Sequence, residues 1–360
     1  MAQITRNFTS EGPLHLAARE ALESAFDQGW ADPRKLSHQS AKARVLKNEA
    51  IESIASNLHI SAEKLEFIGE ARLGHYYSIA GLLRPQDLLL HSVVDKSEIL
   101  ALARSRASMG LPVSLDGQID ISPALAPPSV DRVFAVQIAN GETGVIQNYT
   151  EIIREFPEAR IACDFSSAGI ALPLPERWDS AFFDSKSWQG PEGVGILAIN
   201  SAHKWINPLP HIGPARVPGS VSLPLIMASA IALEATKKEF DGQAIRLREI
   251  SKYLRKEISS TIAHCDIAGN LESSLPHINS LSFLYVEGEE LLRQLDNAGY
   301  ALDSGSACSA DDLAPSHVLA AMGVLTHGNI RITLHASSTQ DEVRDLVQEI
   351  RRVVEGIRSR

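Results

Sequence analysis

Short apolar runs, each bounded by turn residues or charges, alternate with helical patterns through the first two-thirds of the chain. Continuous apolar runs of this length are typical of strands buried on both faces of a parallel sheet. We therefore predict an α/β fold with a mostly parallel sheet. The predicted strands cover residues 65–69, 87–94, 132–139, 159–165 and 194–199.

Apolar residues at helical spacing predict helices over 14–29, 41–57 and about 225–258. Residues 279–286 alternate between apolar and polar like a half-buried strand. The clearest helix begins at Thr339, after which apolar residues recur at i, i+3, i+4 and i+7.

Length and charge restrict the class of protein. A chain of 360 residues is about twice the size of a usual domain, so we predict two domains. The chain has 34 basic and 44 acidic residues, so its net charge is 34 − 44 = −10, and it has no basic block. This charge excludes nucleic acid and anionic membranes as partners. No apolar stretch reaches the roughly 18 residues of a membrane span, and the N-terminus does not resemble a signal peptide. We expect a cytoplasmic protein.

The three cysteines, Cys163, Cys265 and Cys308, cannot all pair and lack metal-ligand spacing, so we predict neither a disulfide framework nor a metal site. Cys308 stands alone among small residues in SGSACSA (304–310). Such an open loop suits a thiol that must travel to a substrate, although an ordinary loop cysteine has the same setting.

Polar residues follow two of the predicted strands. Asp164 ends an apolar run at the edge where α/β folds place ligands. It could hold a protonated ring nitrogen, as the aspartate of pyridoxal phosphate (PLP) enzymes does, or cap a helix. Asn140 in ANGETGVIQ (139–147) could bind a ligand or cap a turn.

Two basic residues have equally open interpretations. Lys186 precedes a Gly-Pro-x-Gly-x-Gly turn between two core strands, where a Schiff-base lysine would be fixed, but most lysines are solvated surface groups. Arg331 lies within an alternating strand, NIRITL (329–334), and suits bidentate binding of a carboxylate or an ordinary ion pair.

The order of these motifs resembles that of the cysteine desulfurases, in the class V aminotransferase group of fold-type I PLP-dependent enzymes. The resemblance covers nearly the whole chain, and its most specific part is the cysteine loop with the Pro-Ser-x-Val-Leu segment that follows. The similar segments are GWADPRKLSHQS (29–40), ANGETGVIQ (139–147), IACDFSSAG (161–169), SGSACSADDLAPSHVLAAMG (304–323) and NIRITL (329–334).

The resemblance implies a large PLP-binding domain (12–237) with a mostly parallel seven-stranded sheet between helices. A smaller α+β domain (1–11 and 238–360) would carry the cysteine loop. It also implies PLP as the cofactor and a homodimer, because Ser220 occupies the place of a threonine that reaches the phosphate of the partner subunit's cofactor.

The resemblance further implies residue roles. Cys308 would be the nucleophile that receives sulfur as a persulfide, and Asp164 would pair with the pyridine nitrogen. Asn140 and Arg331 would hold the substrate carboxylate. The implied cofactor-binding residues are Ala71, Arg72, Lys96, Asn140, Asp164, Ser167, Ser185, Lys186 and Ser220.

The chain departs from the family pattern at the cofactor. Ser187 stands where the family has its lysine, so Lys186, one residue earlier, is our predicted Schiff-base residue. Lys204 in SAHKW (201–205) is the alternative, since that string copies the family's Ser-x-His-Lys although it follows the strand. Lys96 replaces the histidine that stacks on the ring, and Ser167 replaces a glutamine.

The phosphate turn also departs from the pattern. Arg72 replaces its hydroxyl residue, where a cation could bind phosphate instead, and Glu70 adds a negative charge.

The implied activity is transfer of sulfur from L-cysteine to Cys308, with release of L-alanine and delivery of the persulfide to an acceptor protein. The acceptor pathway stays open between iron–sulfur clusters, thio-modified RNA and a cofactor. The departures leave an alternative: a degenerate homologue that carries sulfur or binds a partner without PLP chemistry. A related class V transferase such as a selenocysteine lyase is a third reading.

Overall fold

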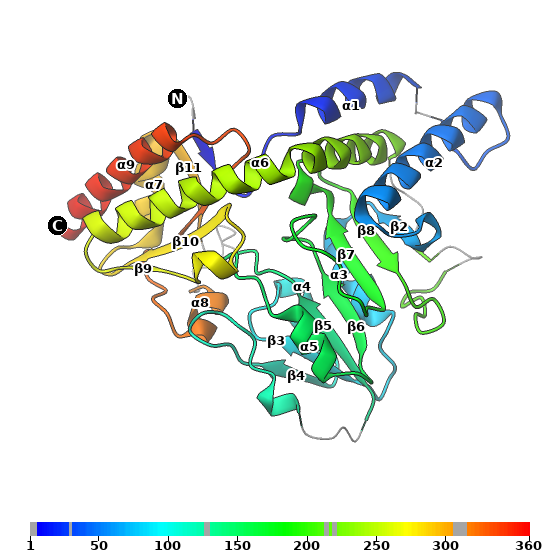
Figure 1. Ribbon diagram of the computed structural model, residues 1–360, viewed down its shortest axis with the longest axis horizontal. Coiled ribbons are helices and arrows are strands. Elements are labelled where there is room, and N and C mark those ends of the chain that lie inside the picture. Colours follow the sequence, from blue (N-terminus) through cyan, green and yellow to red (C-terminus); the bar gives the residue numbers. More distant parts are fainter. Residues whose placement is uncertain (1–5, 29–30, 126–129, 212–215, 218–221, 305–314) are drawn as a thin grey trace.

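The computed structural model describes most of the chain, in two sheets joined by one long helix. The helix α6 (Leu223–Thr261) packs Ile226 and Leu233 into the core of the larger sheet, and Leu247 and Leu254 into that of the smaller one (Figure 1). The described residues are 6–28, 31–125, 130–211, 216–217, 222–304 and 315–360.

The larger sheet has seven strands in the order β2-β8-β7-β6-β5-β3-β4. Every strand is parallel to the others except β8, which is antiparallel to both of its neighbours. The predicted α/β class with a mostly parallel sheet is therefore confirmed. The strands are β2 (Leu65–Ile68), β3 (Leu88–Ser92), β4 (Ser108–Leu111), β5 (Arg132–Gln137), β6 (Arg160–Asp164), β7 (Ser180–Asp184) and β8 (Gly195–Ile199).

Helices cover both faces of this sheet, as the apolar runs predict. In β5, Val133 and Ala135 join a core with helices α3 and α4, whereas Phe134 and Val136 join the core that contains α5 and the first half of α6. Successive side chains of a strand point to opposite faces, so a strand between two helical layers must be apolar throughout. The helices are α1 (Leu16–Gln28), α2 (His38–Leu58), α3 (Ala71–Ala80), α4 (Ser97–Arg104) and α5 (Tyr149–Glu155).

The predicted strand segments and the three predicted helices appear with ends shifted by a few residues. β4 escaped prediction because Ser108–Leu111 is a short edge strand with two exposed residues and no apolar run. Short 3-10 helices complete the large-sheet region and its border: η1 (Ala62–Lys64), η2 (Ser122–Ala124), η3 (Ser185–Trp188) and η4 (Leu271–Ser273).

The smaller sheet has the order β1-β11-β12-β10-β9 and takes in the N-terminal strand, so both described chain ends lie beside it (Figure 1). Its strands are β1 (Arg6–Phe8), β9 (Cys265–Ile267), β10 (Ile278–Phe283), β11 (Tyr300–Ser304) and β12 (Ile330–Thr333). Its helices are α7 (Gly288–Asn297), α8 (His317–Met322) and α9 (Gln340–Arg358). The domain boundary at 237/238 stays a prediction, and α6 crosses it without a break.

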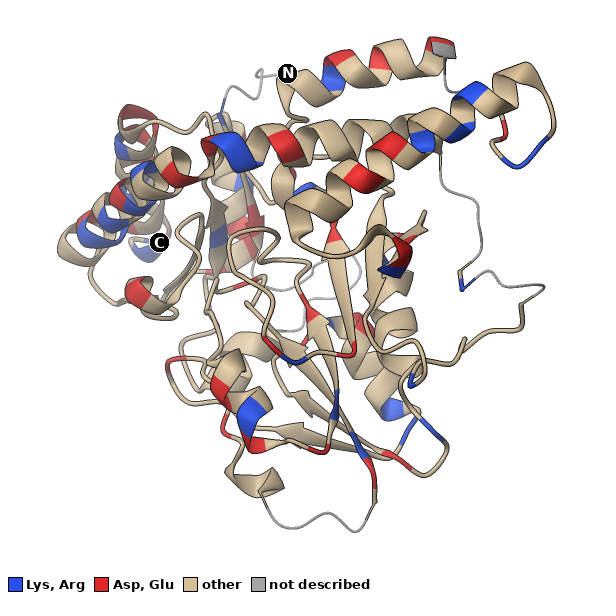
Figure 2. Cartoon of the chain, turned by 45° about the vertical axis from the view of Figure 1, so that its right-hand side comes forward, with Lys and Arg blue, Asp and Glu red and all other residues tan. Residues whose placement is uncertain are grey.

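The helix predicted from Thr339 is confirmed as α9, with a capping box between Thr339 and Glu342. Acidic and basic residues alternate along α9 and the second half of α6, as Figure 2 shows. Within the described part of the chain, no helix has the length and apolar character needed to cross a bilayer.

Candidate active site

Three loops meet at the carboxyl edge of the large sheet. Lys96 follows β3, Asn140 and Gly141 follow β5, and Asp164 ends β6. These strands are parallel neighbours, so their carboxyl ends lie at one edge, where open α/β sheets bind ligands. The side-chain amide of Asn140 donates to the carbonyl of Val94 at 3.0 Å, which joins the first two loops.

Asp164 is a deeply buried carboxylate at this edge. Its Oδ1 accepts hydrogen bonds from the backbone N–H of Ser166 at 2.8 Å and from the Ser166 hydroxyl at 2.5 Å. Nε2 of His75 lies 3.3 Å from the same oxygen. The other carboxylate oxygen, Oδ2, is buried with no partner among the described residues.

The charge state of Asp164 follows from its neighbours. Burial disfavours the ionised form, but the charges of His75 and Lys96 and the hydrogen bonds outweigh it, and they hold the pKa of Asp164 well below its usual range. The carboxylate is therefore ionised at neutral pH. It presents Oδ2 as an unsatisfied acceptor in a buried position.

Lys96 lies beside this carboxylate. Its Nζ donates to the Ser166 hydroxyl at 2.6 Å, so an ammonium, a hydroxyl and a carboxylate form a continuous chain. The stem of Lys96 runs close to Gly141: a Cβ added at Gly141 would lie 3.7 Å from Cε of Lys96 and 2.8 Å from the hydroxyl of Ser167. A glycine at this position allows the loop after β5 to approach both side chains.

These groups fit the ring end of PLP. A buried carboxylate oxygen that lacks a donor is the partner that the N–H of a protonated pyridine requires. The phosphate end is more crowded, because the Glu70 carboxylate already accepts from the backbone N–H of Arg72 at 3.1 Å. This N–H belongs to the first turn of α3, next to Ala71. The Arg72 guanidinium is exposed and lies 3.4 Å from the carboxylate of Glu98.

Comparison with known proteins identifies the family. The family model described as aminotransferase class V matches residues 33–346. A cysteine desulfurase IscS of Anaeromyxobacter dehalogenans is 31% identical over 373 residues, which cover 94% of this chain and 89% of that protein. The chain belongs to the cysteine desulfurase family.

Other cysteine desulfurases match over almost the whole length. A cysteine desulfurase IscS of Dictyoglomus turgidum is 27% identical over 380 residues, covering 99% of this chain and 96% of that protein. Among solved structures, a NifS-like protein has a TM-score of 0.87 at 21% identity, covering 98% of this chain and 99% of that one. The apo cysteine desulfurase of Thermococcus onnurineus has a TM-score of 0.83 at 17% identity, covering 98% and 95%. The fold is thus that of the NifS-like enzymes.

The lysines predicted to hold the cofactor have other partners. The exposed ammonium of Lys186 lies 3.7 Å from Glu192. Lys204 donates to the Asp179 carboxylate at 2.9 Å, and Asp179 precedes β7, at the edge opposite to Asp164. The structure therefore brings neither Lys186 nor Lys204 to Asp164.

The turn between β7 and β8 explains why Lys186 does not reach Asp164. Ser187, where the resemblance places the family's lysine, is the residue of η3 that faces the loop after β6: a Cβ added at Gly169 would lie 2.5 Å from the Ser187 hydroxyl. A neighbouring residue in a tight helical turn points in a different direction. Lys186 is exposed on this turn and pairs with Glu192, and its role as the Schiff-base residue stays a prediction.

The predicted substrate-binding residues are already engaged. Oδ1 of Asn140 accepts from the backbone N–H groups of Glu142 and Thr143, each at 2.9 Å, and its Nδ2 donates to Val94 and Gln137. Asn140 therefore caps its turn, the alternative that the sequence left open. Arg331 reaches the site, where it donates to the carbonyl of Gly141 at 3.4 Å. Its guanidinium also binds the Asp303 carboxylate at 2.7 Å.

The remaining predicted residues fall into two groups. Ser167 lies at the site beside Gly141, whereas the Ser185 hydroxyl is fully buried and donates to Ser229 at 2.8 Å within the core. Cys308 and Ser220 lie outside the described residues.

Sequence reasoning missed His75, Ser166 and Asp303 as members of this site. The one available signal was Ser166, since a serine two residues after an aspartate commonly returns a hydrogen bond to it.

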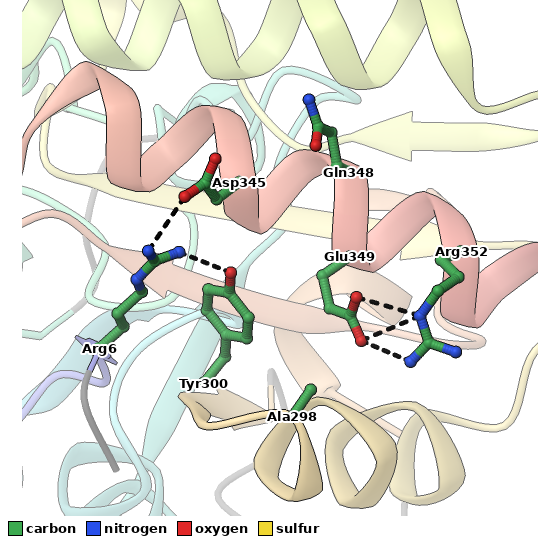
Figure 3. A pocket seen from close by; sticks show the side chains of 7 residues that line it. All are labelled: Arg6, Ala298, Tyr300, Asp345, Gln348, Glu349 and Arg352. Atoms are coloured by element: carbon green, nitrogen blue, oxygen red, sulfur yellow. Dashed lines mark hydrogen bonds and ion pairs between the residues drawn. The ribbon is translucent and has the colours of Figure 1, made fainter. Parts of the chain in front are cut away.

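A surface pocket lies away from Asp164, between α9 and the edge of the small sheet (Figure 3). It measures about 570 Å³, and its charged groups satisfy one another. Arg6 lies 3.0 Å from Asp345 and donates to the Tyr300 hydroxyl at 2.7 Å, while Glu349 pairs with Arg352. Because these groups are mutually paired, the pocket offers no free charge for a ligand.

Proposed function

We propose that this protein is a cysteine desulfurase, which transfers sulfur from L-cysteine to Cys308 and releases L-alanine. The relatives named cysteine desulfurase support the proposal over 94% and 99% of the chain. The observation that carries it is the buried, ionised carboxylate of Asp164, whose Oδ2 lacks a donor at the carboxyl edge of the sheet.

The residues of this chain would divide the work as follows. When bound, PLP supplies an electron sink that allows the α-carbon of the substrate to lose its proton. Asp164 accepts the ring N–H, and His75 and Lys96 keep its carboxylate ionised. Arg331 binds the substrate carboxylate in exchange for Asp303.

Cys308 completes the reaction. Its thiolate attacks the substrate sulfur, an S–S bond forms and the C–S bond of the substrate breaks, with the electron pair left on carbon. Addition of one proton to that carbon, and return of the proton that the α-carbon lost, gives alanine. One thiol and one cysteine thus become one persulfide and one alanine, which balances without an external oxidant. We also propose delivery of the persulfide to an acceptor protein.

A second candidate is a homologue that carries sulfur or binds a partner without PLP chemistry. One observation favours it: Lys186 pairs with Glu192 on the exposed turn, while Ser187 stands where the resemblance places the family's lysine. The acceptor oxygen of Asp164 supports the first candidate, because an ionised buried carboxylate oxygen without a donor suits a ring N–H.

Mass spectrometry after incubation with PLP and L-cysteine tests the proposal. We expect a persulfide on Cys308 and an equal amount of alanine. The Cys308→Ser variant should form neither the persulfide nor alanine. The Cys265→Ser variant, which changes a half-buried cysteine, should form both. A Cys308 that acquires sulfur only when a second desulfurase is added would establish the carrier instead.

We further propose a homodimer, on the resemblance of the Ser220 segment to one that contacts the partner subunit's cofactor. Light scattering of the purified protein should give about twice the mass of the 39.1 kDa chain. A monomer at all concentrations would contradict it.

A further inference from the structure

We propose that Glu142 and Ser316 are positioning residues for Cys308, because together they hold one end of the segment that carries this cysteine at the candidate active site. This role rests on the proposed function and deepens it, since it names residues that direct the nucleophile. Glu142 belongs to the loop after β5, and Ser316 is the residue directly before α8.

One hydrogen bond joins these two residues across 174 positions of the chain. The Ser316 hydroxyl donates to Oε1 of Glu142 at 2.5 Å, and the two residues are only 3% and 8% exposed. Ser316 also caps α8, because its hydroxyl oxygen accepts from the backbone N–H of Leu319 at 3.2 Å. A helix cap needs only that oxygen. The donation of the hydroxyl proton to Glu142 is therefore a contact that the helix itself does not require.

The carboxyl of Glu142 lies where an ionisable group is costly. Burial raises its pKa to about 7, although the Ser316 hydroxyl and the charge of Arg331 act in the opposite direction. A buried polar pair adds little stability over apolar side chains of similar size, but a shift that breaks it leaves a buried group without a partner. The pair therefore favours one arrangement of α8 against the loop after β5.

Other contacts hold the same end of α8. Nε2 of His317 lies 3.0 Å from the carbonyl oxygen of Asp95, in the loop after β3. Val318 and Leu319 belong to one apolar cluster with Val94 of the same loop. Apolar packing has no preferred direction, whereas hydrogen bonds depend on distance and angle. The hydrogen bonds thus fix the orientation of a helix end that apolar packing already places on the large sheet.

The two ends of the segment that carries the cysteine meet the same loop. Before the segment, Asp303 accepts from Arg331 at 2.7 Å, and Arg331 donates to the carbonyl of Gly141 at 3.4 Å. After the segment, Ser316 donates to Glu142, the residue that follows Gly141. If a substrate carboxylate displaces Asp303 from Arg331, the hydrogen bond at the other end still holds. A reacting group kept near its target in this way reacts faster than one that is free to move away.

Two substitutions of Glu142 separate its hydrogen bond from its packing. Leucine has a similar size but no acceptor, whereas the amide oxygen of glutamine can still accept from Ser316. In a single turnover of the PLP-loaded protein with L-cysteine, Glu142→Leu should slow persulfide formation on Cys308 by about ten-fold. Glu142→Gln should stay within about two-fold of the unsubstituted protein.

Exchange of the α-proton of L-alanine with deuterated water provides the readout that a general structural defect would change. This exchange needs the cofactor site but not the thiol, so it should stay within about two-fold in both variants. Backbone hydrogen exchange in α8 is a second readout, which does not involve the reaction. It should become faster in Glu142→Leu and remain unchanged in Glu142→Gln.

Two further variants test whether the residues act through their contact. Ser316→Ala should slow persulfide formation about as much as Glu142→Leu, and the double variant should be no slower than the slower single one, because both changes remove the same hydrogen bond. Thr339→Ala is the matched control, since it removes the N-cap hydrogen bond of α9 instead. Its rate of persulfide formation should equal that of the unsubstituted protein.

The results distinguish this role from the proposed function. Persulfide formation at the unsubstituted rate in Glu142→Leu overturns the positioning role and leaves the desulfurase proposal standing. Equal losses of persulfide formation and alanine exchange also overturn it, because Glu142 would then act on the whole site. Additive losses in the double variant, or unchanged hydrogen exchange in α8, overturn the role of the contact with Ser316. An unsubstituted protein that forms no persulfide contradicts the proposed function and the positioning role with it.

Discussion

Nε2 of His75 lies 3.3 Å from Oδ1 of Asp164, and both side chains are almost completely buried. The contact joins α3 to the end of β6, and the His75 ring also packs edge-on against Phe182 at 4.7 Å. A carboxylate that would otherwise be costly to bury is thus stabilised from within the protein. The carboxylate that we propose as the acceptor for a ring nitrogen is therefore held in place by the protein's own residues.

Asp164→Asn should destabilise the protein by about 3–5 kcal/mol, since it leaves His75 and Lys96 without their buried counter-charge. The folded-state pKa of Asp164 lies below the unfolded value of about 3.9, so its contribution is full above that pH and is lost as the pH falls through the folded value. Urea unfolding from pH 7 to pH 3 measures both effects. If the difference in free energy of unfolding between Asp164→Asn and the unsubstituted protein grew as the pH fell, this explanation would be contradicted.

Glu142→Gln should make stability less dependent on pH. Burial raises the pKa of Glu142 to about 7, against the lowering influence of the Ser316 hydroxyl, which donates to it at 2.5 Å, and of Arg331. A raised carboxyl pKa means that stability declines as the pH rises from about 4.5 to 7. At pH 8 the free energy of unfolding of the Glu142→Gln variant should therefore exceed that of the original protein by up to about 3 kcal/mol.

At pH 4 the two proteins should unfold at nearly the same urea concentration, because Glu142 is then protonated. Equal stability at pH 8 would show that Glu142 is not held in its neutral form.

Asp303→Asn should strengthen binding of L-cysteine. Asp303 accepts from the Arg331 guanidinium at 2.7 Å and from the backbone N–H of Ser10 at 2.6 Å, so it competes with a substrate carboxylate for Arg331. Removal of the charge from this partly buried pair should lower KM by roughly five-fold, about 1 kcal/mol, with little change in kcat. Arg331→Lys is the converse variant and should raise KM. A higher KM in Asp303→Asn would show that Asp303 orients Arg331 rather than competing for it.

Gly141→Ala should destabilise the site by about 1 kcal/mol, because the added Cβ would lie 2.8 Å from the Ser167 hydroxyl and force it aside. Gly242→Ala is the matched control: it lies within α6, and an added Cβ meets no atom within 4 Å. That change should stabilise the protein by about 0.5–1 kcal/mol through helix propensity. Thermal unfolding of the two variants should shift in opposite directions, and a shared direction would refute the contact at Ser167.

The sequence by itself determined the architecture. Apolar runs such as 132–139 and 194–199 predict strands buried on both faces, and the structure contains β5 and β8 there. The capping residue Thr339 and the spacing that follows it predict α9, which the structure also contains. These predictions succeed because burial and capping depend on residue type and local spacing, both of which the sequence displays.

Only the tertiary structure decided which polar groups meet at the edge of the sheet. The sequence favours Lys186, with Lys204 as the alternative, yet Ser187 faces the loop after β6 and Lys96, which follows β3, reaches Ser166. It leaves Arg331 open between carboxylate binding and an ordinary ion pair, and the structure shows an ion pair with Asp303. The reason is geometric: one residue of a turn changes the direction of a side chain, and contacts between loops depend on strand order. Neither quantity is contained in the spacing of residues along the chain.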